Sequence, residues 1–150
     1  MKTTLSNFVI RTERVGEEIP AVDADAPSKI AAYHREHIAP TMQDGKEHLH
    51  VLLLNARLKV IGFHLVSMGS LTESTAHPRE ILRPVILAGA FGFAMTHNHP
   101  SGDPAPSVQD ERFTRRMIEC ADLLVLRLLD HVVIGEGESY YSFREAGIIA

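Results

Sequence analysis

Residues 97–110 read His97-Asn98-His99-Pro100-Ser101-Gly102-Asp103-Pro104-Ala105-Pro106-Ser107-Val108-Gln109-Asp110, directly after the apolar segment 91–96. The apolar segment suits a buried strand, on which residues two apart project from the same face. His97 and His99 are therefore expected to present both imidazoles to one point. Three prolines and a glycine then exclude regular structure as far as Ser107, a good helix N-cap, which places Asp110 in the first turn of the next helix.

This pattern predicts a metal site. Two imidazoles and one carboxylate, with a fourth position open to water, form the ligand set of a catalytic rather than a structural zinc site. A structural alternative exists for each residue alone, because Ser107 and Asp110 can form a variant of the capping box and each histidine can bond to backbone. Together the residues favour the metal, since such groups would be costly to bury unpaired. We predict that His97, His99 and Asp110 bind Zn²⁺.

The same residues resemble the JAMM motif of the MPN/JAB metalloprotease fold, which reads His-x-His-Pro-x-Gly and then Pro-Ser-x-x-Asp. The fuller string is similar to the bacterial RadC branch, and segments 77–80, 130–135 and 141–143 agree with it. The likeness covers residues 28–150. It implies a single RadC-like MPN/JAMM domain over those residues, an α-β-α sandwich related to the cytidine-deaminase-like folds, with residues 1–27 as an N-terminal arm.

Hydrophobic periodicity and turn residues predict an α/β order of elements. Helices are expected at 28–37 with Ser28 as N-cap, at 78–90 with a kink or break at Pro84, and from Ser107 to 123. Strands are expected at 8–10 (an edge strand), 48–55, 59–67, 91–96, 124–134 and 139–143. His48 and His50 alternate with apolar residues and are expected on a solvated face or at the rim of the site, whereas His131 is expected to be a hydrogen-bonded core residue.

Hydrolysis by a zinc-activated water needs a base to take the proton. From residue chemistry alone, Glu47, Glu73 and Glu80 are equal candidates, and each can also be an ordinary surface or helix-start acid. The resemblance implies that Glu47, just before the strand that begins at His48, is the catalytic acid/base. It also implies that Ser107, besides capping its helix, donates a hydrogen bond to the oxyanion of the reaction.

Composition limits the partners and the compartment. With 15 basic and 19 acidic side chains the formal net charge is −4, which gives no bulk attraction to phosphate backbones or anionic membranes. The single cysteine, Cys120, excludes an internal disulfide and fits a reducing compartment. No apolar run approaches the ~20 residues of a membrane span, and residues 1–7 lack the apolar region of a signal peptide. We therefore expect no membrane partner and a cytoplasmic location.

The expected function is a zinc-dependent hydrolase of JAMM type that cleaves amide or peptide bonds in an unidentified substrate. The alternative is a RadC-like, DNA-repair-associated accessory factor whose zinc site is not catalytic. RadC-like chains often carry an N-terminal helix-hairpin-helix segment, for which this chain is too short, and the small basic group Arg112, Arg115 and Arg116 is expected on a solvated helix face. We therefore expect no specific nucleic-acid binding. A zinc deaminase is disfavoured because its His-x-Glu and Pro-Cys-x-x-Cys signature is absent.

Overall fold

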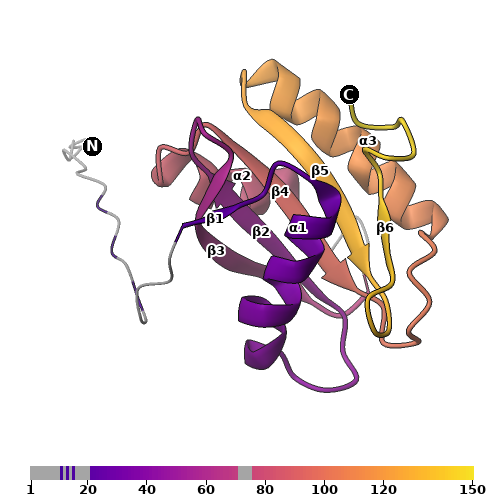
Figure 1. Cartoon of the computed structure of the whole chain (residues 1–150). Helices are drawn as coiled ribbons and strands as arrows, with labels where there is room; N and C mark the ends of the chain where they lie inside the picture. The colour runs from indigo at the N-terminus through magenta and orange to yellow at the C-terminus, as the bar shows by residue number, and fades with distance from the viewer. Residues whose placement is uncertain (1–10, 12, 14, 16–20, 71–75) are drawn as a thin grey trace, which may run out of the picture.

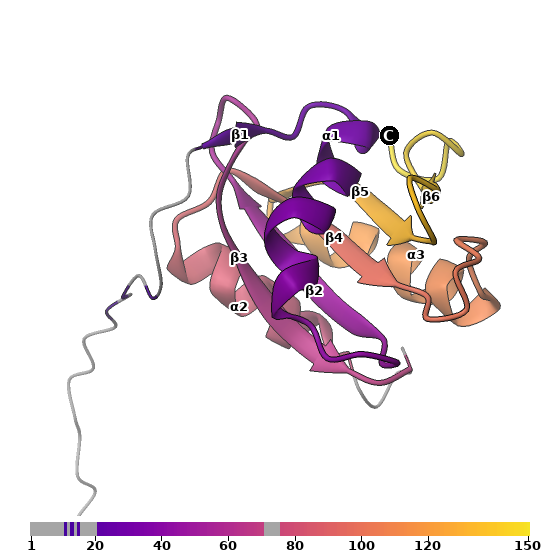
Figure 2. The same ribbon diagram turned by 60° about the horizontal axis from the view of Figure 1, so that its bottom comes forward.

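A six-stranded sheet with helices on both faces forms the described part of the chain (Figures 1 and 2). The computed structural model describes residues 11, 13, 15, 21–70 and 76–150. The strands are β1 (Val22–Asp23), β2 (His48–Leu54), β3 (Lys59–Met68), β4 (Gly92–Asn98), β5 (Arg127–Ile134) and β6 (Tyr140–Ser142). The helices are α1 (Pro27–Tyr33), α2 (Pro78–Leu87) and α3 (Val108–Leu123). The predicted α/β sandwich is confirmed.

The sheet order is β1-β3-β2-β4-β5-β6. β4 and β5 pair in parallel, and the other neighbouring strands pair antiparallel. Parallel neighbours need a long crossover, and α3 supplies it. The predicted hairpin of β2 with β3 and the predicted hairpin of β5 with β6 are both present. As a result, the carboxyl ends of β4 and β5 meet at the edge of the sheet where residues 97–110 begin.

Two hydrophobic cores lie on the two faces of the sheet. α1 covers one face, and α2 and α3 cover the other (Figure 2). β2 contributes to both cores, because Leu52 and Leu54 pack in the core that contains α1 and Leu49 and Val51 pack in the opposite one. Alternate residues of a strand point to opposite faces, so a strand covered on both sides buries nearly every side chain.

Two expectations for the helices were wrong at their ends. α1 begins at Pro27 with Ala26 as N-cap, so Ser28 lies inside the helix. Proline suits the first helical position because its ring fixes φ and its missing N–H has no partner there anyway. After Tyr33 the chain continues as a π-helical turn (His34–Ile38) and a 3₁₀ turn (Ala39–Thr41). α2 is continuous through Pro84 but ends at Leu87, three residues earlier than expected.

The expectation that His48 and His50 lie on a solvated face or at the rim of the site was also wrong. Each is only 2% exposed, because α1 and the turn that follows it cover this face of the sheet. The His48 ring donates from Nδ1 to the carbonyl of Lys46 (3.1 Å) and accepts at Nε2 from the backbone N–H of Gln43 (3.3 Å). The His50 ring lies between those of His48 and His34, with centroids 6.2 and 6.0 Å away. Burial of these rings makes them part of the core.

Part of the predicted N-terminal arm belongs to the sheet. β1 lies within residues 1–27 and pairs with β3 through Val22 and Val60. The predicted edge strand at 8–10 lies outside the described residues. None of the helices in the described part of the chain has the length and apolar character needed to span a bilayer.

The buried histidines predict acid sensitivity. Burial lowers the pKa of His50 to about 4 and that of His34 to about 3. In the unfolded chain both rings titrate near ~6.5, so their stabilising contribution is complete above that pH and is lost as the pH falls toward 4. We predict that His50→Leu reduces the loss of unfolding free energy between about pH 7 and about pH 5 by about 2 kcal/mol relative to the unchanged protein, measured by urea denaturation.

The control is His77→Leu, the same chemical change at an exposed position before α2, away from the groups that act on His50, which should alter the pH dependence much less. Burial raises the pKa of Asp130 to about 6, which contributes with the opposite sign. This contribution is common to all three proteins and cancels in the comparison. Equal pH dependence for His50→Leu and the unchanged protein would contradict the prediction.

Candidate metal centre

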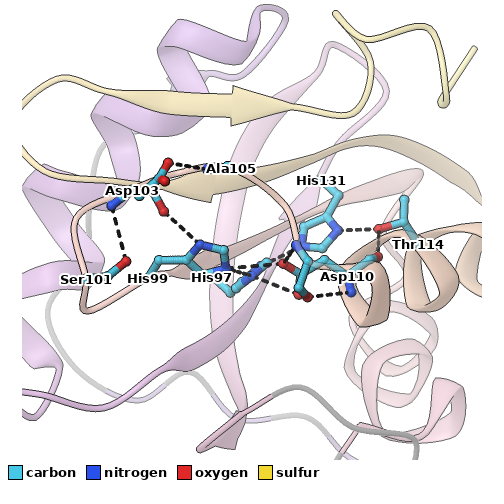
Figure 3. Close-up of polar contacts among 9 residues, drawn as sticks. His97, His99, Ser101, Asp103, Ala105, Asp110, Thr114 and His131 are labelled. Atoms are coloured by element: carbon cyan, nitrogen blue, oxygen red, sulfur yellow. Dashed lines mark hydrogen bonds and ion pairs between the residues drawn. The ribbon is translucent and has the colours of Figure 1, made fainter.

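His97, His99 and Asp110 come together beyond the carboxyl ends of β4 and β5 (Figure 3). The Nε2 atoms of the two histidines lie 3.1 Å apart. Asp110 places Oδ1 3.3 Å from Nε2 of His97 and Oδ2 3.2 Å from Nε2 of His99. His97 and Asp110 are 0% and 2% exposed, and His99 is partly buried. Three donor atoms thus face one point, where they could hold a metal ion.

The loop after β4 turns the chain back toward this point. His99 lies one residue past β4 and still follows β5, because its N–H donates to the carbonyl of Ile134 (3.0 Å). Gly102 then adopts φ +85°, with its N–H bonded to the carbonyl of His99 (2.9 Å). A Cβ at this position would lie 3.0 Å from Cβ of Glu136, so both the backbone conformation and the space require glycine.

Ser107 and Asp110 form the predicted capping box at the start of α3. The Ser107 hydroxyl oxygen accepts from the N–H of Asp110 (3.0 Å), and Oδ2 of Asp110 accepts from the N–H of Ser107 (2.8 Å). The capping box is therefore present, and it is compatible with the ligand role expected of Asp110. The cap fixes the carboxylate so that both of its oxygens also face the histidines.

The tautomer of His97 follows from a chain of hydrogen bonds through His131 and Thr114 (Figure 3). The Thr114 hydroxyl donates to the backbone carbonyl of Asp110 (2.7 Å), so its oxygen must accept from Nδ1–H of His131 (2.6 Å). Burial lowers the pKa of His131 well below its ordinary value, so the ring is neutral and Nε2 is an acceptor. That atom accepts from Nδ1–H of His97 (2.7 Å). Nε2 of His97 is left with a lone pair directed at the site.

The donor atoms of His99 and Asp110 are also oriented by hydrogen bonds. Nδ1–H of His99 donates to the carbonyl of Asp103 (2.9 Å), which leaves a lone pair on Nε2. Burial raises the pKa of Asp110, but a hydrogen bond from His97, whenever that ring carries a proton on Nε2, and the N–H of Ser107 lower it by more, so the carboxyl group is ionised. Three such donor atoms this close repel one another unless a proton or a metal cation lies between them. The chemistry of this donor set fits a divalent metal ion.

The other predicted site residues lie at the margin of this cluster. Ser107 is exposed, and its capping bond uses the oxygen as acceptor, which leaves the hydroxyl proton for another partner. Glu47 is half-buried and directly precedes β2, which pairs with β4 through Leu49 and His97. Among the described residues, no hydrogen bond or ion pair joins Glu47 to the three candidate ligands. The catalytic roles of Glu47 and Ser107 stay predictions.

The rival carboxylates lie elsewhere. Glu80 is in the first turn of α2 and pairs with Arg83 (3.1 Å), and Glu73 is outside the described residues. The sequence did not reveal that His131, expected in the core and 0% exposed, would bond to the candidate ligand His97, 34 positions away. Thr114 was missed although a signal existed, because it follows Asp110 by four residues and so lies on the same face of α3.

Comparison with known proteins gives a consistent relationship. The family model described as "RadC-like JAB domain" matches residues 24–148. A UPF0758 protein of Symbiobacterium thermophilum is 44% identical over 115 residues, which cover 76% of this chain and 49% of the relative. A UPF0758 protein of Clostridium acetobutylicum is 46% identical over 104 residues, with 69% and 45% covered. The chain spans about half the length of the curated relatives it matches.

The cluster predicts one divalent metal ion per chain. The double change His97→Ala, His99→Ala should abolish binding, because it removes both nitrogen ligands and leaves one carboxylate. Elemental analysis of protein purified without chelator provides the measurement. The matched control His64→Ala, His77→Ala replaces two exposed histidines and should retain the metal. Unchanged metal content in the first variant would place the ion elsewhere.

The hydrogen bond between His131 and Thr114 predicts that a change of Thr114 weakens metal binding without abolishing it. Thr114→Val keeps the shape of the side chain but removes the acceptor for Nδ1–H of His131, which frees the tautomer of His97. Loss of such indirect support typically weakens metal binding by about 10–100-fold. Competition with a chromophoric chelator measures the affinity.

Thr96→Val provides the control for the Thr114 change. Thr96 is also buried, and its hydroxyl bonds to Nδ1 of His34 (2.9 Å) on the opposite face of the sheet. It should lose stability without losing metal affinity. The same loss of affinity in both variants would show a general structural effect instead.

Proposed function

The chain belongs to the RadC-like JAB domain family, and from this premise we propose that it is a zinc-dependent hydrolase that cleaves amide or peptide bonds. The observation that carries the proposal is the convergence of His97, His99 and Asp110 with their lone pairs directed at one point. The resemblance of these residues to the JAMM motif supports the reaction class.

Zinc suits this donor set best. It binds histidine nitrogen and carboxylate oxygen at about 2.0–2.2 Å, and two ligand atoms of a tetrahedral zinc site then lie about 3.3 Å apart. The donor atoms here are 3.1–3.3 Å apart. Three protein ligands leave one coordination position open, as in catalytic zinc sites. When bound, zinc supplies a Lewis acid that polarises a carbonyl oxygen and makes water more acidic.

Residues of the chain supply the proton transfer, the oxyanion hydrogen bond and the correct tautomer of His97. Glu47 takes a proton from the attacking water and returns it to the leaving amine, the usual duty of a carboxylate acid/base. Ser107 donates its free hydroxyl proton to the oxyanion, and loss of one such donor typically costs about 2.7–4 kcal/mol of transition-state stabilisation. His131 and Thr114 keep His97 in the tautomer that leaves Nε2 unprotonated.

The proposed substrate is a peptide or other amide rather than a nucleic acid. Arg112, Arg115 and Arg116 are exposed on α3 and offer at most three phosphate contacts, which would give weak binding that fades as salt rises. The overall charge of −4 adds no attraction for a duplex. A cytoplasmic location remains our expectation, on the basis of the single cysteine.

Glu47→Gln should retain zinc and the fold while hydrolysis falls by about 10²-fold or more, because the amide cannot accept the proton. The zinc-loaded protein is incubated with a peptide mixture from a digested bacterial lysate. Mass spectrometry then detects newly formed amino termini.

The matched control is Glu80→Gln, the same change in an acid paired with Arg83 at the start of α2, which should keep full activity. Full activity of Glu47→Gln would assign the base to another carboxylate. Absence of hydrolysis by every zinc-loaded form, including the unchanged protein, would favour an accessory factor with a non-catalytic zinc site.

A further inference from the structure

The side chain of Asn98 joins the end of β4 to the segment that carries Glu47. Its Oδ1 accepts from the N–H of His48 (2.8 Å), and its Nδ2 donates to the carbonyl of Lys46 (2.9 Å). The two bonds therefore lie on either side of Glu47, and Asn98 itself lies between the two candidate histidine ligands. We propose that Asn98 is a positioning residue that sets Glu47 against the metal centre, an inference that rests on the proposed role of Glu47 as the base.

The geometry explains how the Asn98 side chain can fix the direction of the Glu47 side chain. Two planar peptide groups flank the Cα of Glu47, and each turns about one soft dihedral angle. The Lys46 carbonyl belongs to the peptide group before Glu47, and the His48 N–H belongs to the one after it. A single planar amide bonded to both restricts φ and ψ of Glu47 together. The direction of its Cα–Cβ bond is thereby fixed.

Each of these peptide groups has a second hydrogen bond. The Glu47 carbonyl accepts from the N–H of Gly69 (2.8 Å), and Gly69 has φ +100°, a conformation that favours glycine. The Lys46 carbonyl also accepts from Nδ1–H of His48 (3.1 Å). The segment that leads into β2 is thus held by several hydrogen bonds, and Asn98 supplies the ones that connect it to β4.

Asparagine suits this position because it offers one acceptor and one donor in a plane. The ladder of β2 with β4 ends at the pair Leu49 and His97, and the Asn98 side chain continues the bonding one residue further. Aspartate has the same shape but only acceptors when ionised, so one oxygen would oppose the Lys46 carbonyl. Alanine would leave both backbone groups without this partner.

The backbone of Asn98 is held as firmly as its side chain. It is the last β4 residue paired with β5, opposite Ile134, and the next N–H, of His99, bonds to the Ile134 carbonyl. The ligands and the base are therefore fixed to one another through a single residue. A displacement of about 1 Å in a reacting group can cost about 10²-fold in rate, so this connection is expected to affect turnover.

The test compares Asn98→Ala with Glu47→Gln singly and together. The substrate is the peptide from the lysate digest that the unchanged protein cleaves fastest. Asn98→Ala should retain zinc and lower kcat by about 10²-fold with little change in KM. The double variant should be no slower than Glu47→Gln alone, because Asn98 acts through Glu47. Asn98→Asp, the second variant, keeps the acceptor for the His48 N–H but loses the donor to Lys46, so it should also lower kcat, and it serves if Asn98→Ala does not fold.

A second readout does not depend on activity. Hydrogen exchange at the His48 amide of the zinc-loaded protein, followed by NMR, should be faster in Asn98→Ala, because the acceptor of that N–H is gone. The matched control is Asn55→Ala. Oδ1 of Asn55 accepts from the N–H groups of Arg57 (2.9 Å) and Lys59 (3.1 Å) at the far end of β2. It should alter neither kcat nor exchange at His48.

The outcomes separate the two proposals. Full turnover or unchanged His48 exchange in Asn98→Ala would overturn the positioning role while leaving the proposed function intact. So would a further loss in the Glu47→Gln background as large as the loss in the unchanged protein. Full turnover of Glu47→Gln would overturn the assignment of the base, and the positioning role with it.

Discussion

The carboxylate of Asp110 takes part both in the cap of α3 and in the candidate metal centre, and the rest of the candidate site depends on this double role. One oxygen accepts from the Ser107 N–H and so completes the capping box, while both oxygens face the histidine nitrogens. A negative charge in the first turn is favoured by the helix dipole, so the acid is stabilised there before any cation binds. The candidate site therefore needs no separate element for its acidic member, because the start of the crossover helix between two parallel strands supplies Asp110.

The buried polar groups around Asp110 form a layer in which each group has a defined partner. Thr114, His131 and His97 continue the hydrogen bonds into β5 and β4. Next to His131, the Asp130 carboxylate accepts from the hydroxyl of Ser142 (2.6 Å), which ties β6 to the same strand. Unpaired, such groups would each cost free energy in a low-dielectric interior, whereas satisfied networks specify one arrangement. These hydrogen bonds therefore hold the candidate ligands and also the strands that carry them.

Residue spacing and turn residues predicted the features that depend on neighbouring positions in the sequence. The hairpin of β2 with β3, the N-cap at Ser107 and the convergence of His97, His99 and Asp110 follow from spacing and turn residues, and the structure has all three. The pattern could not show that α1 covers the face of β2 that carries its histidines, since that depends on packing between distant segments. Nor could the contact of His131 with a ligand be read from spacing, because it arises only when β5 pairs with β4. Glu47 came from family resemblance alone.

The last three residues of β4 explain why a strand suits this site. Thr96 bonds to His34 on the α1 side, His97 faces the candidate ligands and His131 on the α3 side, and Asn98 reaches the backbone that leads into β2. Alternation along a strand sends successive side chains to opposite faces, so consecutive residues can hold different layers of the fold. Elements of regular structure also position catalytic groups more accurately than loops do. Three consecutive residues at the end of β4 thus join the turn after α1, the candidate ligands and the entry to β2, and each of the three contacts reaches a different element.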